Sequence, residues 1–192
     1  ITIGQVIEPR VLKDWEDLKN FEPPKKISKG RFWLGKLMFK IAGNSKFKMG
    51  SIDNFFFERF HFLRGFRNIC IDIKKNKDKL MELGEILVDW YCWLIDEWAK
   101  LGADGIIATD DWGAQSGPFI SPRDFDKVIK PLYQKVIDRI HKYKMYFILH
   151  SCGNIYSIIP KLIEVGVDCL QIDSPLMTGL NKLGEFSGKI CY

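Results

Sequence analysis

Apolar positions after residue 46 form short runs separated by longer stretches with helical spacing. The runs 47–53, 104–109, 144–151 and 167–172 are short and rich in aliphatic and aromatic residues, which is typical of buried strands. Between them apolar residues recur at steps of three and four, which is typical of amphipathic helices. The connections are too long for hairpins, so this alternation predicts parallel strands joined by helical crossovers.

Several residues mark the ends of the predicted helices. Asn54 and Asn154 follow two predicted strands and are expected to cap the helices after them, and Pro131 is expected to kink the helix in which it lies. The longest helix is expected to end at Gly102. Its apolar stripe consists of Leu80, Leu83, Leu87, Trp90, Leu94 and Trp98.

Polar groups follow the predicted strands at their carboxyl ends. These groups are Asp53, the pair Asp110 and Asp111, His150 with Cys152, and Asp173. A (β/α)8 TIM barrel gathers all such ends around one mouth, whereas a doubly wound open sheet concentrates its site where the strand order reverses. We therefore predict an α/β fold of the barrel type, with the open sheet as the alternative.

The sequence His-Ser-Cys-Gly at 150–153 is the strongest candidate for a metal site. In a strand, His150 and Cys152 point to one face while Ser151 points to the other. Imidazole nitrogen and thiolate sulfur are ligands that zinc prefers, so these two residues predict a Zn²⁺ site that Asp110, Asp111 or Asp173 would complete. A structural histidine beside an unligated thiol is the alternative.

The remaining strand-end residues are candidates for substrate contacts and catalysis. Two consecutive aspartates at a mouth favour a catalytic role for Asp110 and Asp111, although one aspartate after a strand often caps a turn. Asp53, Trp112 and Asp173 are predicted to bind substrate. The two other histidines, His61 and His141, lie in helical patterns and are interpreted as structural or exposed.

Charge is concentrated near the start of the chain. The net charge is +5, and eight lysines and arginines lie between Glu22 and Asp53 without an acidic residue among them. This local run argues against a general nucleic-acid surface and indicates either a solvated arm or contact with an anionic substrate or partner. We therefore separate residues 1–45, a basic arm without a clear period that includes a possible amphipathic helix, from 46–192.

Cysteine usage and hydropathy bear on location. Five cysteines at irregular spacing predict free thiols, which fits a reducing compartment such as the cytoplasm. The sequence has no signal peptide and no transmembrane span, so we expect no membrane partner. It starts without methionine, and it ends in what looks like a new strand, from which we expect the chain to be a fragment of a longer protein.

With the strand ends marked, the sequence resembles the uroporphyrinogen decarboxylase superfamily, which includes zinc-dependent methyltransferases that act with coenzyme M and corrinoid proteins. The resemblance covers about 46–192. It is carried by GADGI at 102–106, DDWG at 110–113, ISPRDF at 120–125, KPLY at 130–133, and HSCGN at 150–154 with Ile159-Pro160 after it. It implies a (β/α)8 barrel of which this chain is roughly the central half.

Within that superfamily, His150 and Cys152 resemble the first two zinc ligands of the methyltransferase branch. The resemblance implies methyl transfer from a corrinoid, carried on a partner protein, to a thiol. That branch has a further cysteine well downstream, and Cys191 lies too early in a predicted strand to supply it. The alternative is uroporphyrinogen decarboxylation in haem biosynthesis, although the arginine-rich motif of true decarboxylases is not found in the chain. A non-catalytic binding domain is the third hypothesis.

Overall fold

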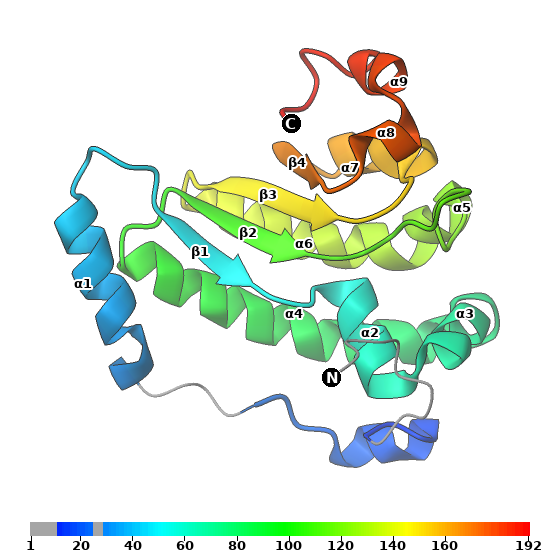
Figure 1. The fold of residues 1–192 in the computed structure, drawn as a ribbon. Helices are drawn as coiled ribbons and strands as arrows, with labels where there is room; N and C mark the ends of the chain where they lie inside the picture. Colours follow the sequence, from blue (N-terminus) through cyan, green and yellow to red (C-terminus); the bar gives the residue numbers. More distant parts are fainter. Residues whose placement is uncertain (1–10, 25–28) are drawn as a thin grey trace, which may run out of the picture.

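The computed structural model describes residues 11–24 and 29–192 (Figure 1). Lys25 and Lys26, part of the predicted basic arm, lie outside the described residues. Four parallel strands form one sheet in the order β1-β2-β3-β4. Their bounds are Met49–Ile52 for β1, Gly105–Thr109 for β2, Tyr146–Ser151 for β3 and Cys169–Ile172 for β4. All four predicted strands are thus confirmed.

Helices connect the strands. Between β1 and β2 lie α2 (Phe56–Arg64), α3 (Phe66–Lys75) and α4 (Lys77–Lys100). Between β2 and β3 lie α5 (Pro122–Asp124) and α6 (Lys130–Lys142). Helix α7 (Ile159–Glu164) precedes β4, and α8 (Pro175–Thr178) and α9 (Leu180–Gly184) follow it. In Figure 1, α4, α6 and α7 lie on one side of the sheet. The long helix α4 ends before Gly102, as its apolar pattern predicts.

The hydrophobic core lies between these helices and one face of the sheet. Phe147, Leu149 and Leu170 are almost fully buried against the helices, whereas Met49 and Tyr146 on the other face are 47% and 59% exposed. Because side chains alternate along a strand, one face of each strand packs in the core and the other remains open. The polar groups at the strand ends divide between these two faces by the same rule.

The strand order distinguishes the two predicted folds in part. Consecutive strands are neighbours, and a parallel bridge pairs Cys191 with Cys169 on the far edge of β4. The chain at Cys191 therefore continues the same order, as expected for a further strand beginning near Lys189. A parallel α/β sheet in sequential order agrees with part of a (β/α)8 barrel, and the order does not reverse among the described strands.

Two helix predictions meet different outcomes. Directly before α6 the chain forms a π-helical turn, Phe125–Ile129, and the kink expected at Pro131 stays a prediction. Proline supplies no backbone N–H, and a widened turn is one way to accommodate the missing bond. The prediction that Asn54 caps α2 is wrong: Asn54 adopts a φ of 55° and the helix begins after Phe55.

The N-terminal segment also contacts the core. Leu12 and Leu18 are buried, and the Arg64 guanidinium donates hydrogen bonds to the carbonyl oxygens of Leu12 (3.0 Å) and Lys13 (2.7 Å). The domain boundary at 45/46 stays a prediction.

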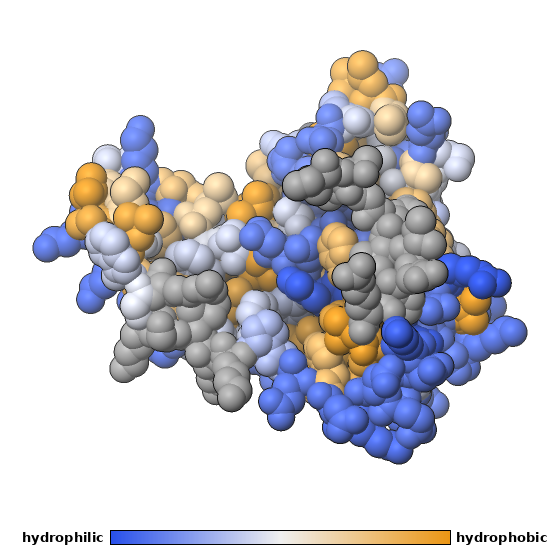
Figure 2. All heavy atoms as spheres, turned by 60° about the horizontal axis from the view of Figure 1, so that its bottom comes forward, coloured by the Kyte–Doolittle hydropathy of each residue, from blue (hydrophilic) through white to orange (hydrophobic). Residues whose placement is uncertain are grey.

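Helix α1 (Trp33–Ala42) is the amphipathic helix considered for this region. It packs on α4 through Phe39, which lies 6.1 Å from Trp98 between ring centroids. Its other face is apolar and exposed (Figure 2), with Trp33, Leu34, Leu37, Met38 and Ile41 as its members. None of the helices in the described part of the chain is both long and apolar enough to cross a membrane.

Candidate metal and active site

The carboxyl ends of β2, β3 and β4 bring several polar side chains together on the open face of the sheet. Thr109, His150 and Gln171 are partners in the strand register, so their side chains lie in one row on the same face. Two residues beyond this row, Asp111 and Cys152 follow on the same face. The side chains of His150 and Asp111 are 19% and 39% exposed, which leaves them accessible from this end of the sheet.

His150 and Cys152 converge as the strand pattern predicts. The Cys152 Sγ atom lies 3.4 Å from His150 Nε2, and the thiol donates to Asp173 Oδ2 at 3.8 Å. Asp173 follows β4 and comes from the next strand along the sheet. A nitrogen, a sulfur and a carboxylate from two neighbouring strands therefore meet at one point.

Asp111 completes a group of three possible metal ligands. Its Oδ1 atom lies 3.7 Å from His150 Nε2 and accepts a hydrogen bond of 2.9 Å from the Cys152 backbone N–H. One ligand atom from each of Asp111, His150 and Cys152 lies within 4.8 Å of the others. Two ligands held about 2.0–2.3 Å from a tetrahedral zinc ion are roughly 3.5 Å apart. The donor set and its spacing therefore fit zinc.

The Cys152 thiol is held in its protonated form in the absence of a metal. Burial raises its pKa to about 12, and the negative charges of Asp111 and Asp173 act in the same direction. Both carboxylates disfavour a second negative charge beside them, whereas a divalent cation at this point would favour all three anionic ligands. The negative charges gathered here would therefore be stabilised by a cation at this point.

A close backbone contact fixes the position of Cys152. The Gly113 N–H donates to the Cys152 carbonyl oxygen at 3.1 Å, and the Asn154 N–H donates to Ala114 at 2.9 Å, so the loops after β2 and β3 are joined. Gly153 adopts a φ of 78°, and a Cβ there would lie 2.2 Å from the Gly113 carbonyl oxygen. Glycine is required at 153 both for the backbone angle and for this contact. The loop crossing therefore positions the metal-ligand candidates.

Asp110 lies on the other side of the sheet from this group. It is fully buried and accepts hydrogen bonds from the Tyr133 hydroxyl (2.6 Å) and from the backbone N–H groups of Phe57 (3.1 Å) and Glu58 (2.8 Å). Asp110 is thus the cap of α2, supplied from another strand end. Burial raises its pKa to about 7 although its three donors oppose the shift. Its predicted catalytic role stays a prediction, and its position is structural.

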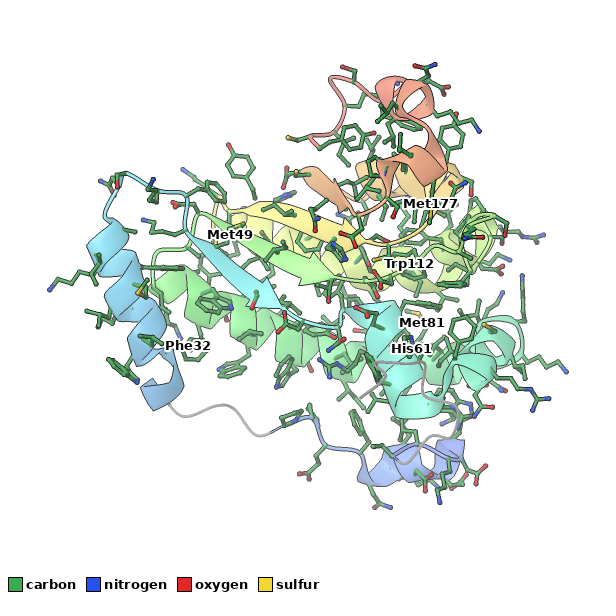
Figure 3. The ribbon with its side chains drawn as sticks, viewed as in Figure 1. Phe32, Met49, His61, Met81, Trp112 and Met177 are labelled. Carbon is green, nitrogen blue, oxygen red and sulfur yellow. The ribbon has the colours of Figure 1, made fainter. Side chains whose placement is uncertain are left out.

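Trp112 lies in the core, between α2 and α6 (Figure 3). Its ring stacks on Phe57 with centroids 4.6 Å apart, and its Nε1–H donates to the Tyr133 hydroxyl at 3.1 Å. With none of its surface exposed, Trp112 has no access to the open face. The predicted substrate contact of Trp112 stays a prediction that the location does not favour.

Asp53 and Asp173, the other predicted substrate-binding residues, are separated. Asp173 contacts Cys152, whereas Asp53 follows β1 and lines a pocket of about 300 Å³. The rest of this pocket is formed by Phe32, Ser51, Arg59, Trp90, Leu94 and Trp98. The structure therefore joins Asp173, but not Asp53, to the metal-ligand candidates.

Three residues of this end of the sheet are not among the sequence-based candidates. Glu58, in the first turn of α2, accepts a hydrogen bond of 3.0 Å from the Thr109 hydroxyl, and Gln171 bonds to His150. Burial raises the pKa of Glu58, and the charge of Asp111 adds to this effect. Strand register identifies Thr109 and Gln171 once the pairing is known. No local pattern marks Glu58, because helix docking places it.

The two other histidines lie apart from the site. His141 pairs with Asp168 at 2.9 Å on an exposed surface. His61 is buried in α2, and burial lowers its pKa. Both positions agree with the structural or exposed roles interpreted from the sequence.

Comparison with solved structures finds a similar fold. A methyltransferase from Methanosarcina mazei superposes with a TM-score of 0.66 over 81% of this chain, at 16% sequence identity. The chain spans 44% of the length of that structure. At this identity the likeness concerns the fold.

Comparison by sequence identifies the family. No protein of the curated set matches the chain. The family model described as Uroporphyrinogen decarboxylase (URO-D) matches residues 61–182. This match covers most of the chain, including the ends of β2 and β3 where the metal-ligand candidates lie. The chain therefore belongs to the uroporphyrinogen decarboxylase (URO-D) family.

Proposed function

We propose that this protein is a zinc-dependent, methyltransferase-like member of the URO-D family, which transfers a methyl group from a corrinoid or similar donor to a thiol. One observation carries the proposal: the ligand atoms of Asp111, His150 and Cys152 converge at the carboxyl end of the sheet. One oxygen, one nitrogen and one sulfur suit zinc, and three protein ligands with a fourth position left open are typical of catalytic zinc sites. The similarity of the fold to that of a methyltransferase from M. mazei also supports the proposal.

Each residue of the site would have a definite task. Asp111, His150 and Cys152 would hold zinc, which when bound acts as a Lewis acid that lowers the pKa of a thiol ligand. Methyl transfer to a thiol replaces its S–H bond by an S–CH3 bond and releases one proton, while the corrinoid keeps the electron pair of the broken carbon–cobalt bond. We assign acceptance of that proton to the Glu58 carboxylate, because burial raises its pKa and Thr109 holds it at the same end of the sheet.

The fold and the partner belong to the same proposal. We infer that the sheet is part of a (β/α)8 barrel, supported by the sequential strand order and the parallel bridge at Cys191. The corrinoid would be carried by a partner protein that docks at the open end of the strands. All five cysteines are free, so a reducing compartment such as the cytoplasm suits a site that needs the Cys152 thiol.

Zinc content tests the proposal. We expect the full-length protein to bind stoichiometric zinc, Cys152→Ser to lose it, and Cys169→Ser to retain it, since Cys169 on β4 is not one of the three candidate ligands. The zinc-loaded protein should then demethylate methylcobalamin in the presence of a thiol. The change in absorbance of the corrinoid measures this reaction. Failure of the wild type to bind zinc would refute the metal-dependent function.

Uroporphyrinogen decarboxylation is the second candidate, favoured by the description of the matching family. Of the two consecutive aspartates, Asp111 is the accessible one and could stabilise a protonated pyrrole in such a reaction. Incubation of the full-length protein with uroporphyrinogen distinguishes the two, because only a decarboxylase yields porphyrinogens with fewer carboxylates. Turnover of either kind would exclude a purely binding domain.

A further inference from the structure

Gln171 is the neighbour of His150 across the sheet. The two residues are register partners on β3 and β4, and the His150 Nδ1 atom hydrogen-bonds to the Gln171 side-chain oxygen. The other ring nitrogen, Nε2, faces Cys152 Sγ and Asp111 Oδ1. One nitrogen of the imidazole thus contacts Gln171, and the other faces the two further metal-ligand candidates.

The partner on the opposite side of His150, Thr109, cannot donate a proton to the ring. Thr109 donates its hydroxyl proton to Glu58 Oε2 at 3.0 Å and accepts from the Asn54 backbone N–H at 2.9 Å. A hydroxyl has one proton to give, so Thr109 has none left for His150. Among the register partners of His150, only Gln171 contacts a ring nitrogen.

We propose that Gln171 is a positioning residue that holds the proton of His150 on Nδ1 and leaves the Nε2 lone pair directed at the metal position, an inference that rests on the proposed zinc function. A neutral imidazole has one N–H and one lone pair, and an accepting oxygen at Nδ1 selects the tautomer with the proton there. The reverse amide orientation would put the proton on Nε2 and block a ligand bond. Histidine ligands are commonly oriented by such an acceptor at the other nitrogen.

Variants at this position separate orientation from folding. Gln171→Leu removes the acceptor at similar size, Gln171→Glu keeps an acceptor, and Gln134→Leu is a matched control on α6, where Gln134 bonds to the exposed Asp138. In metal-free full-length protein, ¹⁵N NMR of the imidazole ring reports which nitrogen carries the proton. We expect the Nδ1–H form in the wild type, Gln171→Glu and Gln134→Leu, and a loss of that preference in Gln171→Leu.

Zinc affinity, measured by competition with a chelator, is the second readout. We expect Gln171→Leu to bind zinc roughly 10–100-fold more weakly, with affinity largely kept in Gln171→Glu and Gln134→Leu. An unchanged tautomer and unchanged affinity in Gln171→Leu would overturn the inference. If the wild type binds no zinc, the proposed function fails, and the NMR comparison on metal-free protein alone decides the role of Gln171.

Discussion

Asp110 and Asp111 are consecutive residues whose carboxylates lie on opposite faces of the sheet. Asp110 is buried and caps α2, whereas Asp111 is partly exposed and lies 3.7 Å from His150. The alternation of side chains at the end of β2 separates them. Two identical side chains therefore acquire different roles, one in stability and one in the candidate metal site.

Substitution of Asp110 should affect stability, whereas substitution of Asp111 should affect zinc binding. We expect Asp110→Ala to lower the free energy of unfolding by about 2–4 kcal/mol, because it leaves the buried Tyr133 hydroxyl and the first turn of α2 without an acceptor. Asp111→Asn should change stability by no more than about 0.5 kcal/mol but weaken zinc binding at least roughly tenfold. Urea unfolding and chelator competition measure the two effects. A large loss of stability in Asp111→Asn, with stability unchanged in Asp110→Ala, would contradict these roles.

The buried carboxyl of Asp110 should make stability depend on pH. Burial raises its pKa to about 7 in the folded protein, whereas an aspartate in an unfolded chain titrates near about 4. Between these values the folded protein keeps a proton that the unfolded chain has released. The stabilising contribution of this group is therefore complete below about pH 4 and is lost as the pH rises through about 7.

A pairwise comparison isolates this contribution. Asp110→Asn has no titrating group at the position, so other ionisable residues cancel in the difference between it and the wild type. We expect the unfolding free energy of the wild type, relative to Asp110→Asn, to fall as the pH goes from about 4 to about 7. Urea unfolding at each pH gives the values. A constant or rising difference would show that Asp110 is not the proton-holding group.

Cys152 should react slowly with alkylating reagents when no metal is present. With a pKa of about 12, its thiolate is a very small fraction at pH 8, and the rate should rise roughly tenfold per pH unit up to about pH 11. Asp173→Asn should increase the rate, because it removes one of the negative charges that disfavour the thiolate. Iodoacetamide labelling with peptide mass spectrometry measures each cysteine separately. Rapid labelling of Cys152 at pH 7 would be inconsistent with this environment.

The loop crossing should be intolerant of a side chain at residue 153. Gly153→Ala places a Cβ against the Gly113 carbonyl at a positive φ, so we expect a loss of more than about 1 kcal/mol in stability and weaker zinc binding as Cys152 shifts. Gly184→Ala is the control, since no atom lies within 4 Å of its added Cβ. Thermal unfolding and zinc affinity report on both variants. Equal stability and equal zinc affinity of the two variants would show that the contact between Gly153 and Gly113 does not position Cys152.

Prediction from sequence was most reliable for features set by neighbours along the chain. Hydrophobic spacing identified the four strands and the helix α4, and the two-residue period of a strand placed His150 and Cys152 on one face. Capping was less predictable. Asn54 occupies the expected position before α2, yet the cap comes from Asp110, which is 53 residues from Phe57 in the sequence.

The sequence by itself determined the alternation of strands and helices and the convergence of His150 with Cys152, because both depend on local periodicity. Only the tertiary structure decided which groups join them. Strand register put Gln171 beside His150, and docking of α2 brought Glu58 to Thr109. The tertiary structure also placed Asp111 beside the candidate metal ligands and Asp110 in the core. These contacts depend on how distant segments pack, and no local pattern records that packing.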